Sequence, residues 1–336
     1  MQYVNEGHTG LKVSRILIGT MTFGKYNDEK DCFRIMDMAK DFGINYLDTG
    51  NLYGGGVQYY GRVEEILGRY FKLGGNRRES FIVNTKCFQP MHYAPDGPND
   101  SMGLSAFKIY RSLEASLRRM QTDHVEIYTT HHCEEDTNWD EIYGAYENII
   151  SQGKTYYVGS SNYGGRHLVE AKYEAQKRNF LGFISEQTRY NLFCRLPELE
   201  VMPACKKYGI AFNAYAPLAG GFLANNALDP KEGTRGYGKS IYSDSLGTWN
   251  EGENRNQLLQ LKKLADDMGE TMSTIALAWQ FNNPNVSSVI CGCRTPEQLE
   301  ASVHALDVKL GEDVMKELDR IFPGPGGPGP QAYIHW

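Results

Sequence analysis

SAFKIYRSLEASLRRMQTDHVEIYTT, residues 105–130, joins a helical pattern to a strand-like one. Its first part carries apolar residues three or four positions apart with arginines between them, which predicts an amphipathic helix. These apolar positions are Phe107, Tyr110, Leu113, Leu117 and Met120. The second part, HVEIYTT (124–130), is rich in β-branched and aromatic residues and predicts a strand. Because the strand-like SFIVNT (80–85) precedes the helix, the region is a strand–helix–strand unit.

The same alternation continues in both directions along the chain. Eight segments are predicted strands: ILIG (16–19), NYLD (45–48), SFIVNT (80–85), HVEIYTT (124–130), TYYVGS (155–160), GFISEQ (182–187), IAFNAY (210–215) and SSVICG (287–292). Eight strands alternating with helices favour a closed (β/α)8 TIM barrel over an open doubly wound sheet. An open dinucleotide-binding sheet usually carries GxGxxG after its first strand, whereas GTMTFG (19–24) stands there.

Three further segments complete the predicted architecture. YVNEGHTGLKVSR (3–15) reads as a β-hairpin with its turn at His8, Thr9 and Gly10, placed to plug the bottom of the barrel. Residues 222–254 form a polar, glycine-rich insertion after the seventh strand. An extra C-terminal helix and the tail FPGPGGPGPQAYIHW (322–336) end the chain. Residues 1–336 are therefore expected to form one barrel domain.

The composition of the chain argues against several classes of protein. A formal net charge of -6 and the absence of lysine or arginine runs disfavour a nucleic-acid partner. No apolar run is long enough to span a membrane, and the opening residues lack a signal-peptide pattern, so a cytoplasmic protein is expected. The 7 cysteines form no framework, which predicts reduced thiols. Cys291 and Cys293 lack a second ligand pair, so no metal is expected there.

Four chemically useful side chains follow the predicted strands at their carboxyl ends. They are Asp48, Tyr53, Lys86 and His131. In a βα barrel these ends meet at one mouth, where such a set suits carbonyl reduction. Tyr53 would donate a proton to the carbonyl oxygen, and the Lys86 ammonium would lower its pKa. Asp48 would hold the lysine charged, and His131 would orient the substrate oxygen or assist proton transfer.

The motifs around these residues resemble those of the aldo-keto reductase family over nearly the whole chain. The matching motifs are DTGNLYG (48–54), EEILG (64–68), NTK (84–86), IYTTH (127–131), VGSSN (158–162), EQTRYN (186–191), AYAPLAGG (214–221) and CGCRTPEQL (291–299). The resemblance implies a nicotinamide-dependent reductase whose catalytic tetrad is Asp48, Tyr53, Lys86 and His131. Within the family the layout is most similar to bacterial members linked to aldehyde reduction or deoxysugar-nucleotide biosynthesis.

The resemblance also implies a cofactor site. Ser161, Asn162 and Gln187 match the residues that hold the nicotinamide amide, and Tyr215 matches the aromatic on which its ring stacks. Main-chain amides of Ala216, Leu218 and Gly220 would face the pyrophosphate, and Thr20 would lie near the nicotinamide ribose. At the adenosine end the family's usual lysine and arginine are replaced by Gly292 and Gln298, which leaves Arg294 as the one basic residue. Since one arginine can grip a phosphate bidentately, NADP(H) is favoured, with NAD(H) as the alternative.

The sequence also contains features that suggest other functional classes. GTRGYGKS (233–240) fits a phosphate-loop pattern, but neither a strand nor a suitable helix flanks it. His131, His132 and Cys133 could suggest zinc, yet neighbours on a strand point to opposite faces, so these three cannot all turn inward. Tyr128 and His131 also fall on opposite faces of a strict strand, so the strand must end or twist before the mouth. A regulatory or channel-associated subunit of this fold would bind cofactor without turnover. The expected partner is a small-molecule carbonyl compound, with a keto sugar as one possibility, and the oligomeric state stays open.

Overall fold

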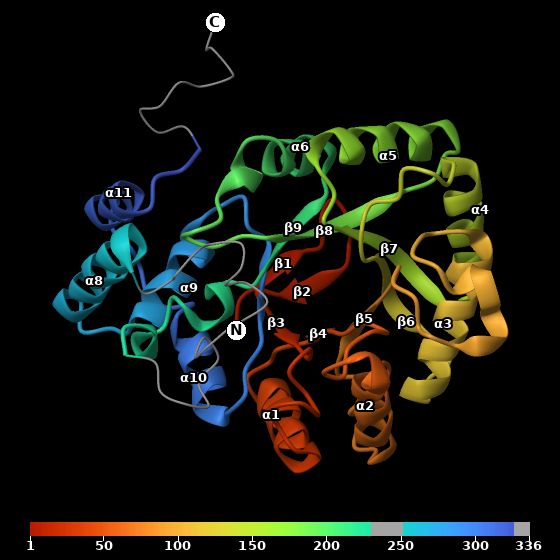
Figure 1. Ribbon diagram of the computed structural model, residues 1–336, viewed down its shortest axis with the longest axis horizontal. Coiled ribbons are helices and arrows are strands. Elements are labelled where there is room, and N and C mark those ends of the chain that lie inside the picture. Colours follow the sequence, from red (N-terminus) through yellow and green to blue (C-terminus); the bar gives the residue numbers. More distant parts are fainter. Residues whose placement is uncertain (230–250, 326–336) are drawn as a thin grey trace, which may run out of the picture.

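Eight parallel strands close into a barrel in the computed structural model, which describes residues 1–229 and 251–325 (Figure 1). The strands are β3 (Ile16–Gly19), β4 (Tyr46–Asp48), β5 (Ile82–Cys87), β6 (Val125–Thr130), β7 (Thr155–Ser161), β8 (Phe183–Arg189), β9 (Ala211–Tyr215) and β10 (Ser288–Cys291). The last strand pairs with the first, Ile290 facing Leu17. The predicted (β/α)8 barrel and all eight of its strands are confirmed, with ends that differ by at most two residues.

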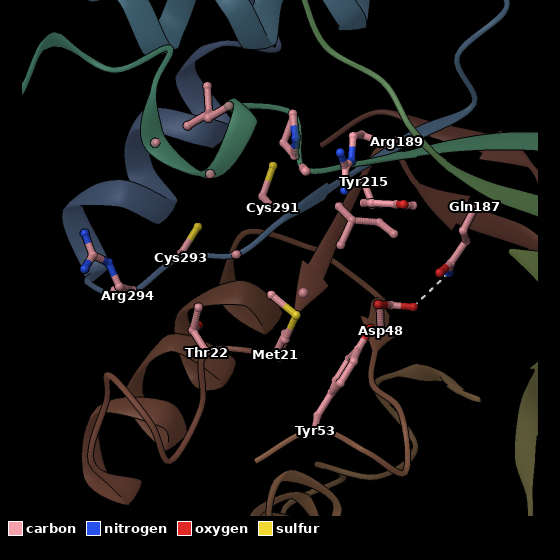
Figure 2. A pocket seen from close by; sticks show the side chains of 18 of the residues that line it. Met21, Thr22, Asp48, Tyr53, Gln187, Arg189, Tyr215, Cys291, Cys293 and Arg294 are labelled. Carbon is pink, nitrogen blue, oxygen red and sulfur yellow. Dashed lines mark hydrogen bonds between the residues drawn. The ribbon is translucent and has the colours of Figure 1, made fainter. Parts of the chain in front are cut away.

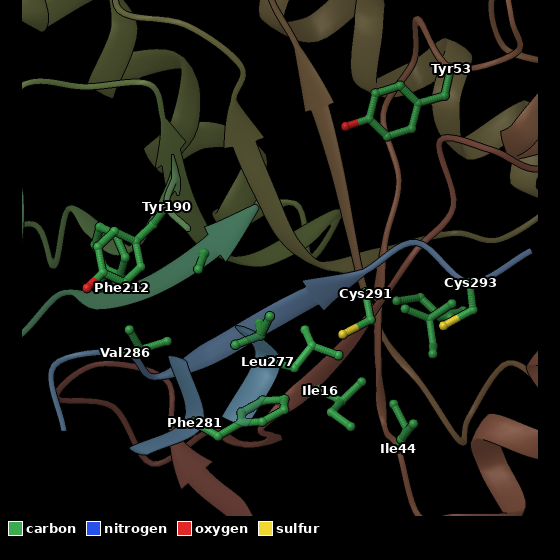
Figure 3. Packing of buried hydrophobic residues seen from close by; sticks show 14 of the residues in the cluster. Ile16, Ile44, Tyr53, Tyr190, Phe212, Leu277, Phe281, Val286, Cys291 and Cys293 are labelled. Atoms are coloured by element: carbon green, nitrogen blue, oxygen red, sulfur yellow. The ribbon is translucent and has the colours of Figure 1, made fainter. Parts of the chain in front are cut away.

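Helices surround the barrel and shield the outer faces of its strands. They are α1 (Glu29–Asp41), α2 (Arg62–Lys72), α3 (Ala106–Met120), α4 (Trp139–Ser151), α5 (Gly165–Lys177), α6 (Val201–Tyr208), α8 (Gly252–Asp267), α9 (Met272–Asn282), α10 (Pro296–His304) and α11 (Glu312–Ile321). Ile16 and Ile18 pack in the large cluster between strands and helices, whereas Leu17 belongs to the smaller cluster inside the barrel. This alternation follows the two-residue period of a strand. Figure 3 shows part of the outer cluster, with Ile16 near Cys291.

Helix α3 corrects one detail of the predicted amphipathic pattern. Leu113, Leu117 and Met120 are buried as expected. Phe107 is not, because 47% of it is exposed. At 100° per residue, Phe107 lies about 120° around the helix from Leu113, so these two residues cannot share one narrow face. The small residues Ser112 and Ser116 are buried instead, and Phe107 lies outside the core.

The predicted N-terminal hairpin is confirmed as β1 (Tyr3–Asn5) paired antiparallel with β2 (Lys12–Ser14). Its turn lies against the amino end of β9, where His8 N donates to Gly209 O over 2.8 Å. Gly7 is required there, since its φ is +61° and a Cβ would stand 2.5 Å from Gly209 O.

Glu6 of this hairpin is fully buried in the lower end of the barrel. Its Oε1 accepts hydrogen bonds from Tyr46 OH (3.0 Å) and from Asn213 Nδ2 (2.7 Å). Glu6 Oε2 and Asn213 Oδ1 are buried too, and no hydrogen bond to either of them comes from the described residues. Burial raises the pKa of the Glu6 carboxyl to about 7, although the Asn213 and Tyr46 bonds act in the opposite direction. The hairpin therefore closes this end of the barrel with a buried acid whose pKa is raised toward neutrality.

The predicted insertion is shorter than expected at its far end, because α8 begins at Gly252 and the insertion was expected to reach residue 254. Of the rest, residues 222–229 are described and include the short 3-10 helix η5 (Asn225–Ala227). The phosphate-loop-like residues 233–240 lie outside the described residues, as does the tail from 326 onward. The extra C-terminal helix is confirmed as α11, which packs beside α8 (Figure 1). Among the described residues no helix is long and apolar enough to cross a membrane, and all seven cysteines are free thiols.

Candidate active site

A cavity of about 660 Å³ opens at the carboxyl ends of the barrel strands. Asp48, Tyr53, Lys86 and His131 all line it, and Figure 2 shows Asp48 and Tyr53 among the lining side chains. Asp48 is the last residue of β4, and Tyr53 lies in the loop that follows. Lys86 precedes the last residue of β5, and His131 comes directly after β6. The four side chains expected from the sequence are thus brought together at one mouth.

Lys86 is held between a carboxylate and the tyrosine hydroxyl. Its Nζ donates to Asp48 Oδ1 over 2.6 Å and to Thr49 O over 2.7 Å, and it lies 3.4 Å from Tyr53 OH. Only 2% of the lysine side chain is exposed. Burial lowers the pKa of Lys86, and the Asp48 carboxylate counteracts that effect. The contact therefore keeps a cation beside the Tyr53 hydroxyl in a site with little water.

The carboxylate of Asp48 is itself fixed by two amide groups. Its Oδ1 accepts hydrogen bonds from Asn84 Nδ2 (2.9 Å) and Gln187 Nε2 (2.8 Å), in addition to the lysine. Asn84 is held in turn by Thr129 Oγ1 over 2.7 Å. Asn84 was not predicted from the sequence, although its position two residues before Lys86 places it on the same inward face of β5.

His131 is a neutral imidazole at the wall of the cavity. Burial lowers its pKa well below the usual value, and the charge of Lys86 adds to that effect. Its ring meets that of Tyr53 edge to face, with centroids 5.9 Å apart. Its buried Nδ1 has no hydrogen-bond partner among the described residues. A neutral ring in this position can donate one hydrogen bond to an oxygen in the cavity.

His131 and His132 both line the cavity, their rings stacked 5.1 Å apart. The expectation that neighbours must face opposite sides fails here because β6 ends at Thr130, before either histidine. Its corollary, that the strand ends before the mouth, is confirmed. Among residues 1–229 and 251–325 no group of three or more His, Cys, Asp or Glu side chains is arranged to hold a metal ion.

The residues expected to hold a nicotinamide amide form one hydrogen-bonded group. Ser161 Oγ donates to Gln187 O over 2.9 Å, and Asn162 Nδ2 donates to Ser161 Oγ over 3.0 Å and to His131 O over 2.9 Å. Tyr215 OH donates to Asn162 Oδ1 over 2.7 Å. These side chains line the cavity beside Asp48 and Tyr53. Their donors and acceptors suit an amide, and the Tyr215 ring offers it a flat surface.

Beyond Tyr215 the chain turns so that its backbone lines the cavity. Ala216 and Ala219 have φ values of +51° and +48°, and Gly220 and Gly221 follow with +72° and +109°. Positive φ at alanine is strained and is commonly found where a backbone serves a ligand. Successive main-chain N–H groups in such a turn can form an anion-binding concavity. Ala216, Leu218 and Gly220, the residues expected to face a pyrophosphate, all line the cavity.

Several lining residues were not expected from the sequence. Ser273 and Thr274 come from the first turn of α9, whose amide groups favour anions, and Arg189 closes β8. Cys291 and Cys293 also line this part of the cavity (Figure 2). The sequence TMSTIALAW (271–279) predicts the start of a helix. It does not predict that this helix start lies at the mouth of the barrel, because that depends on how α9 packs.

At the far end of the cavity Gly292, Arg294 and Gln298 lie together as expected. The guanidinium of Arg294 lies 5.9 Å from the centre of the Tyr26 ring, and its backbone N–H is bound by Gln298 Oε1 at 2.8 Å. Thr20 is the exception among the expected cofactor residues, because it is fully buried and is not among the residues that line the cavity. Its hydroxyl donates to Asp48 O over 2.8 Å.

The fold and this arrangement agree with what sequence comparison finds. The family model described as Aldo/keto reductase family matches residues 15–322, and the chain belongs to this family of oxidoreductases. It is 45% identical to the uncharacterized oxidoreductase YrpG of Bacillus subtilis, over 99% of each chain. It is 34% identical to a probable voltage-gated potassium channel subunit beta of Arabidopsis thaliana, over 96% of this chain and 97% of that one. A putative aryl-alcohol dehydrogenase of Schizosaccharomyces pombe shares 29% identity over 94% of each chain.

Proposed function

We propose that the protein is an NADP(H)-dependent carbonyl reductase in which Tyr53 protonates the oxygen of an aldehyde or ketone. The observation that carries this proposal is the contact of Lys86 Nζ with both Asp48 Oδ1 and Tyr53 OH at the base of the cavity. A buried cation beside a phenol stabilises the phenolate that remains when the proton leaves.

Each of the four residues has a defined task in this scheme. The cofactor, when bound, supplies a hydride to the carbonyl carbon. Tyr53 OH donates a proton to the carbonyl oxygen, which would otherwise carry the negative charge. Neutral His131 donates a hydrogen bond to the same oxygen and fixes its direction. Asp48 keeps Lys86 charged and in place.

The lining of the cavity supports a dinucleotide. One end offers the amide and hydroxyl groups of Ser161, Asn162 and Gln187, and the middle offers the strained turn after Tyr215. The other end offers the Arg294 guanidinium, which forms no ion pair with the described residues. A guanidinium can bind a phosphate with two parallel hydrogen bonds, so we favour NADP(H) over NAD(H).

A purified-protein assay tests the proposal. NADPH oxidation is followed with a panel of aldehydes, ketones and keto sugars, for the wild type, Tyr53→Phe and the control Tyr59→Phe, which alters an exposed tyrosine outside the cavity. We expect Tyr53→Phe to lose at least about two orders of magnitude in kcat, the usual contribution of general acid catalysis. Tyr59→Phe should keep wild-type rates.

A second candidate is a cofactor-binding subunit without significant turnover, favoured by the similarity to proteins named as probable potassium channel beta subunits. The two candidates separate in the same assay. If wild type and Tyr53→Phe bind NADPH equally and neither oxidises it with any carbonyl compound, the second candidate replaces the first.

A further inference from the structure

A second cavity of about 540 Å³ lies between helices α2 and α3. We call it the α2–α3 cavity. Its third wall is the segment from Met91 through the 3-10 helix η2 (Ala94–Asp100). Tyr60 lines both this cavity and the candidate active site. The two spaces therefore share one side chain as a common wall.

The η2 wall is anchored to α3 by charged contacts. Asp100 accepts backbone hydrogen bonds from Met91 N (2.7 Å) and Tyr93 N (3.0 Å), and its carboxylate lies 3.5 Å from Lys108 Nζ. Arg111 donates to Asp96 Oδ1 over 3.0 Å. Because both ends of η2 are tied in this way, the cavity is already formed before any ligand enters.

The charges that line the α2–α3 cavity leave one cation available. Its cationic side chains are Arg69, Lys108, Arg111, Arg118 and Arg119, and its carboxylates are Glu65, Asp96 and Asp100. Four of the five cations are paired with a carboxylate. Arg118 is the exception, since it forms no ion pair within residues 1–229 and 251–325. Among the lining carboxylates, Glu65 forms no ion pair with the described residues, but the charge of Arg69 attracts it.

Aromatic rings supply the remaining surface. Tyr93 and Phe107 are both exposed, although rings of this size are usually buried. The Arg111 guanidinium lies 5.2 Å from the centre of the Tyr93 ring and orients it. Phe107, which lies off the buried face of α3, thus has its ring at the cavity. Both exposed rings line the same cavity as the Arg118 guanidinium, and such a lining favours a flat apolar ligand that carries an anionic group.

We propose that the α2–α3 cavity binds a small aromatic anion, a carboxylate or phosphate ester on a planar ring, with Arg118 as its charge partner. Its volume is in the range of small-molecule sites. A ligand there contacts Tyr60 and so changes how the neighbouring cavity receives a carbonyl compound. The binding stands independently of the proposed reductase function, and only its effect on turnover rests on that function.

Binding is tested by calorimetry with 1-naphthyl phosphate as the probe, with and without saturating NADP⁺. We expect one saturable site in both conditions, and roughly tenfold weaker binding in Arg118→Ala, the loss typical of one hydrogen bond to a charged group. Arg118→Lys should restore part of the affinity. The matched control Arg166→Ala removes an exposed arginine on α5, outside the cavity, and should bind like the wild type. Neutral 1-naphthol should bind more weakly than the phosphate.

Coupling is tested by measuring carbonyl reduction with and without the probe. In the wild type, saturating probe should change KM for the aldehyde at least about twofold. In Tyr60→Ala the probe should still bind while this effect disappears. The proposal is overturned if no saturable binding occurs at millimolar probe, or if binding is abolished by NADP⁺ and unchanged in Arg118→Ala. A protein without turnover would leave the calorimetric result intact, so failure of the reductase proposal would be recognised separately.

Discussion

Replacing Glu6 by glutamine is expected to stabilise the protein at neutral and alkaline pH. The carboxyl is fully buried, and its pKa is raised from 4.5 to about 7. A group with a raised carboxyl pKa holds its proton more tightly in the folded chain than in the unfolded one. Its contribution to stability is therefore greatest below pH 4.5, declines as pH rises from 4.5 to 7, and is constant above that.

The size of the effect follows from the shift. Each pKa unit corresponds to about 1.4 kcal/mol, so ionisation of Glu6 costs the folded state about 3 kcal/mol at pH 8 relative to pH 4. Glutamine removes this cost and adds an N–H where Glu6 Oε2 and Asn213 Oδ1 lack a hydrogen-bond donor from the described residues. It keeps an oxygen for the bonds from Tyr46 and Asn213.

The measurement is urea unfolding at pH 5, 6, 7 and 8 for the wild type, Glu6→Gln and the control Glu79→Gln, which changes an exposed glutamate. The difference in free energy of unfolding between Glu6→Gln and the wild type should increase with pH in favour of Glu6→Gln. The difference between Glu79→Gln and the wild type should stay the same at every pH. If the free energy of unfolding of Glu6→Gln also kept a constant difference from the wild type at every pH, the inference that burial raises the Glu6 pKa would be wrong.

Three further outcomes are expected. Lys86→Met should lower kcat at pH 7 at least about a hundredfold, since it removes the cation beside Tyr53, and full activity in a steady-state assay would contradict the proposed role. Arg294→Ala should raise KM for NADPH about tenfold or more while leaving KM for NADH nearly unchanged; equal effects on both would show that no 2′-phosphate is bound there. Gly7→Ala should cost about 2–4 kcal/mol in urea unfolding, because the residue has a positive φ and its Cβ would meet Gly209 O, so a wild-type midpoint would refute that contact.

The barrel could be predicted from the sequence because its signal is repeated eight times, and each strand carries its own β-branched pattern. Residues at strand ends were predictable for the same reason: Asp48, Lys86 and His131 follow directly from where the strands stop. Phe107 was placed wrongly because its three-residue spacing from Tyr110 was taken as a shared face, although it lies about 120° around the helix from Leu113.

Features that depend on packing between distant segments could not be read from the sequence. Glu6 resembles an ordinary hairpin residue until the barrel surrounds it. The α2–α3 cavity is lined by one loop and two helices, so no single stretch of sequence predicts it. Thr20 was expected near the nicotinamide ribose, and the hydrogen bond from its hydroxyl to the backbone carbonyl of Asp48 is a contact that a sequence motif does not reveal.

The seam between the first and last barrel strands has a consequence for how the chain is made. Arg15 donates to the carbonyls of Phe281, Val286 and Ser287, the last of which is 272 residues away, and β3 pairs with β10 beside it. The ribosome must therefore synthesise residues 15 to 291 before β3 can pair with β10. Until then β3 has an open edge that other chains could pair with. Synthesis of this protein should thus depend on protection of its N-terminal segments during translation, and a circular permutant opened between β9 and β10 would bring the two sides of the seam together from the start.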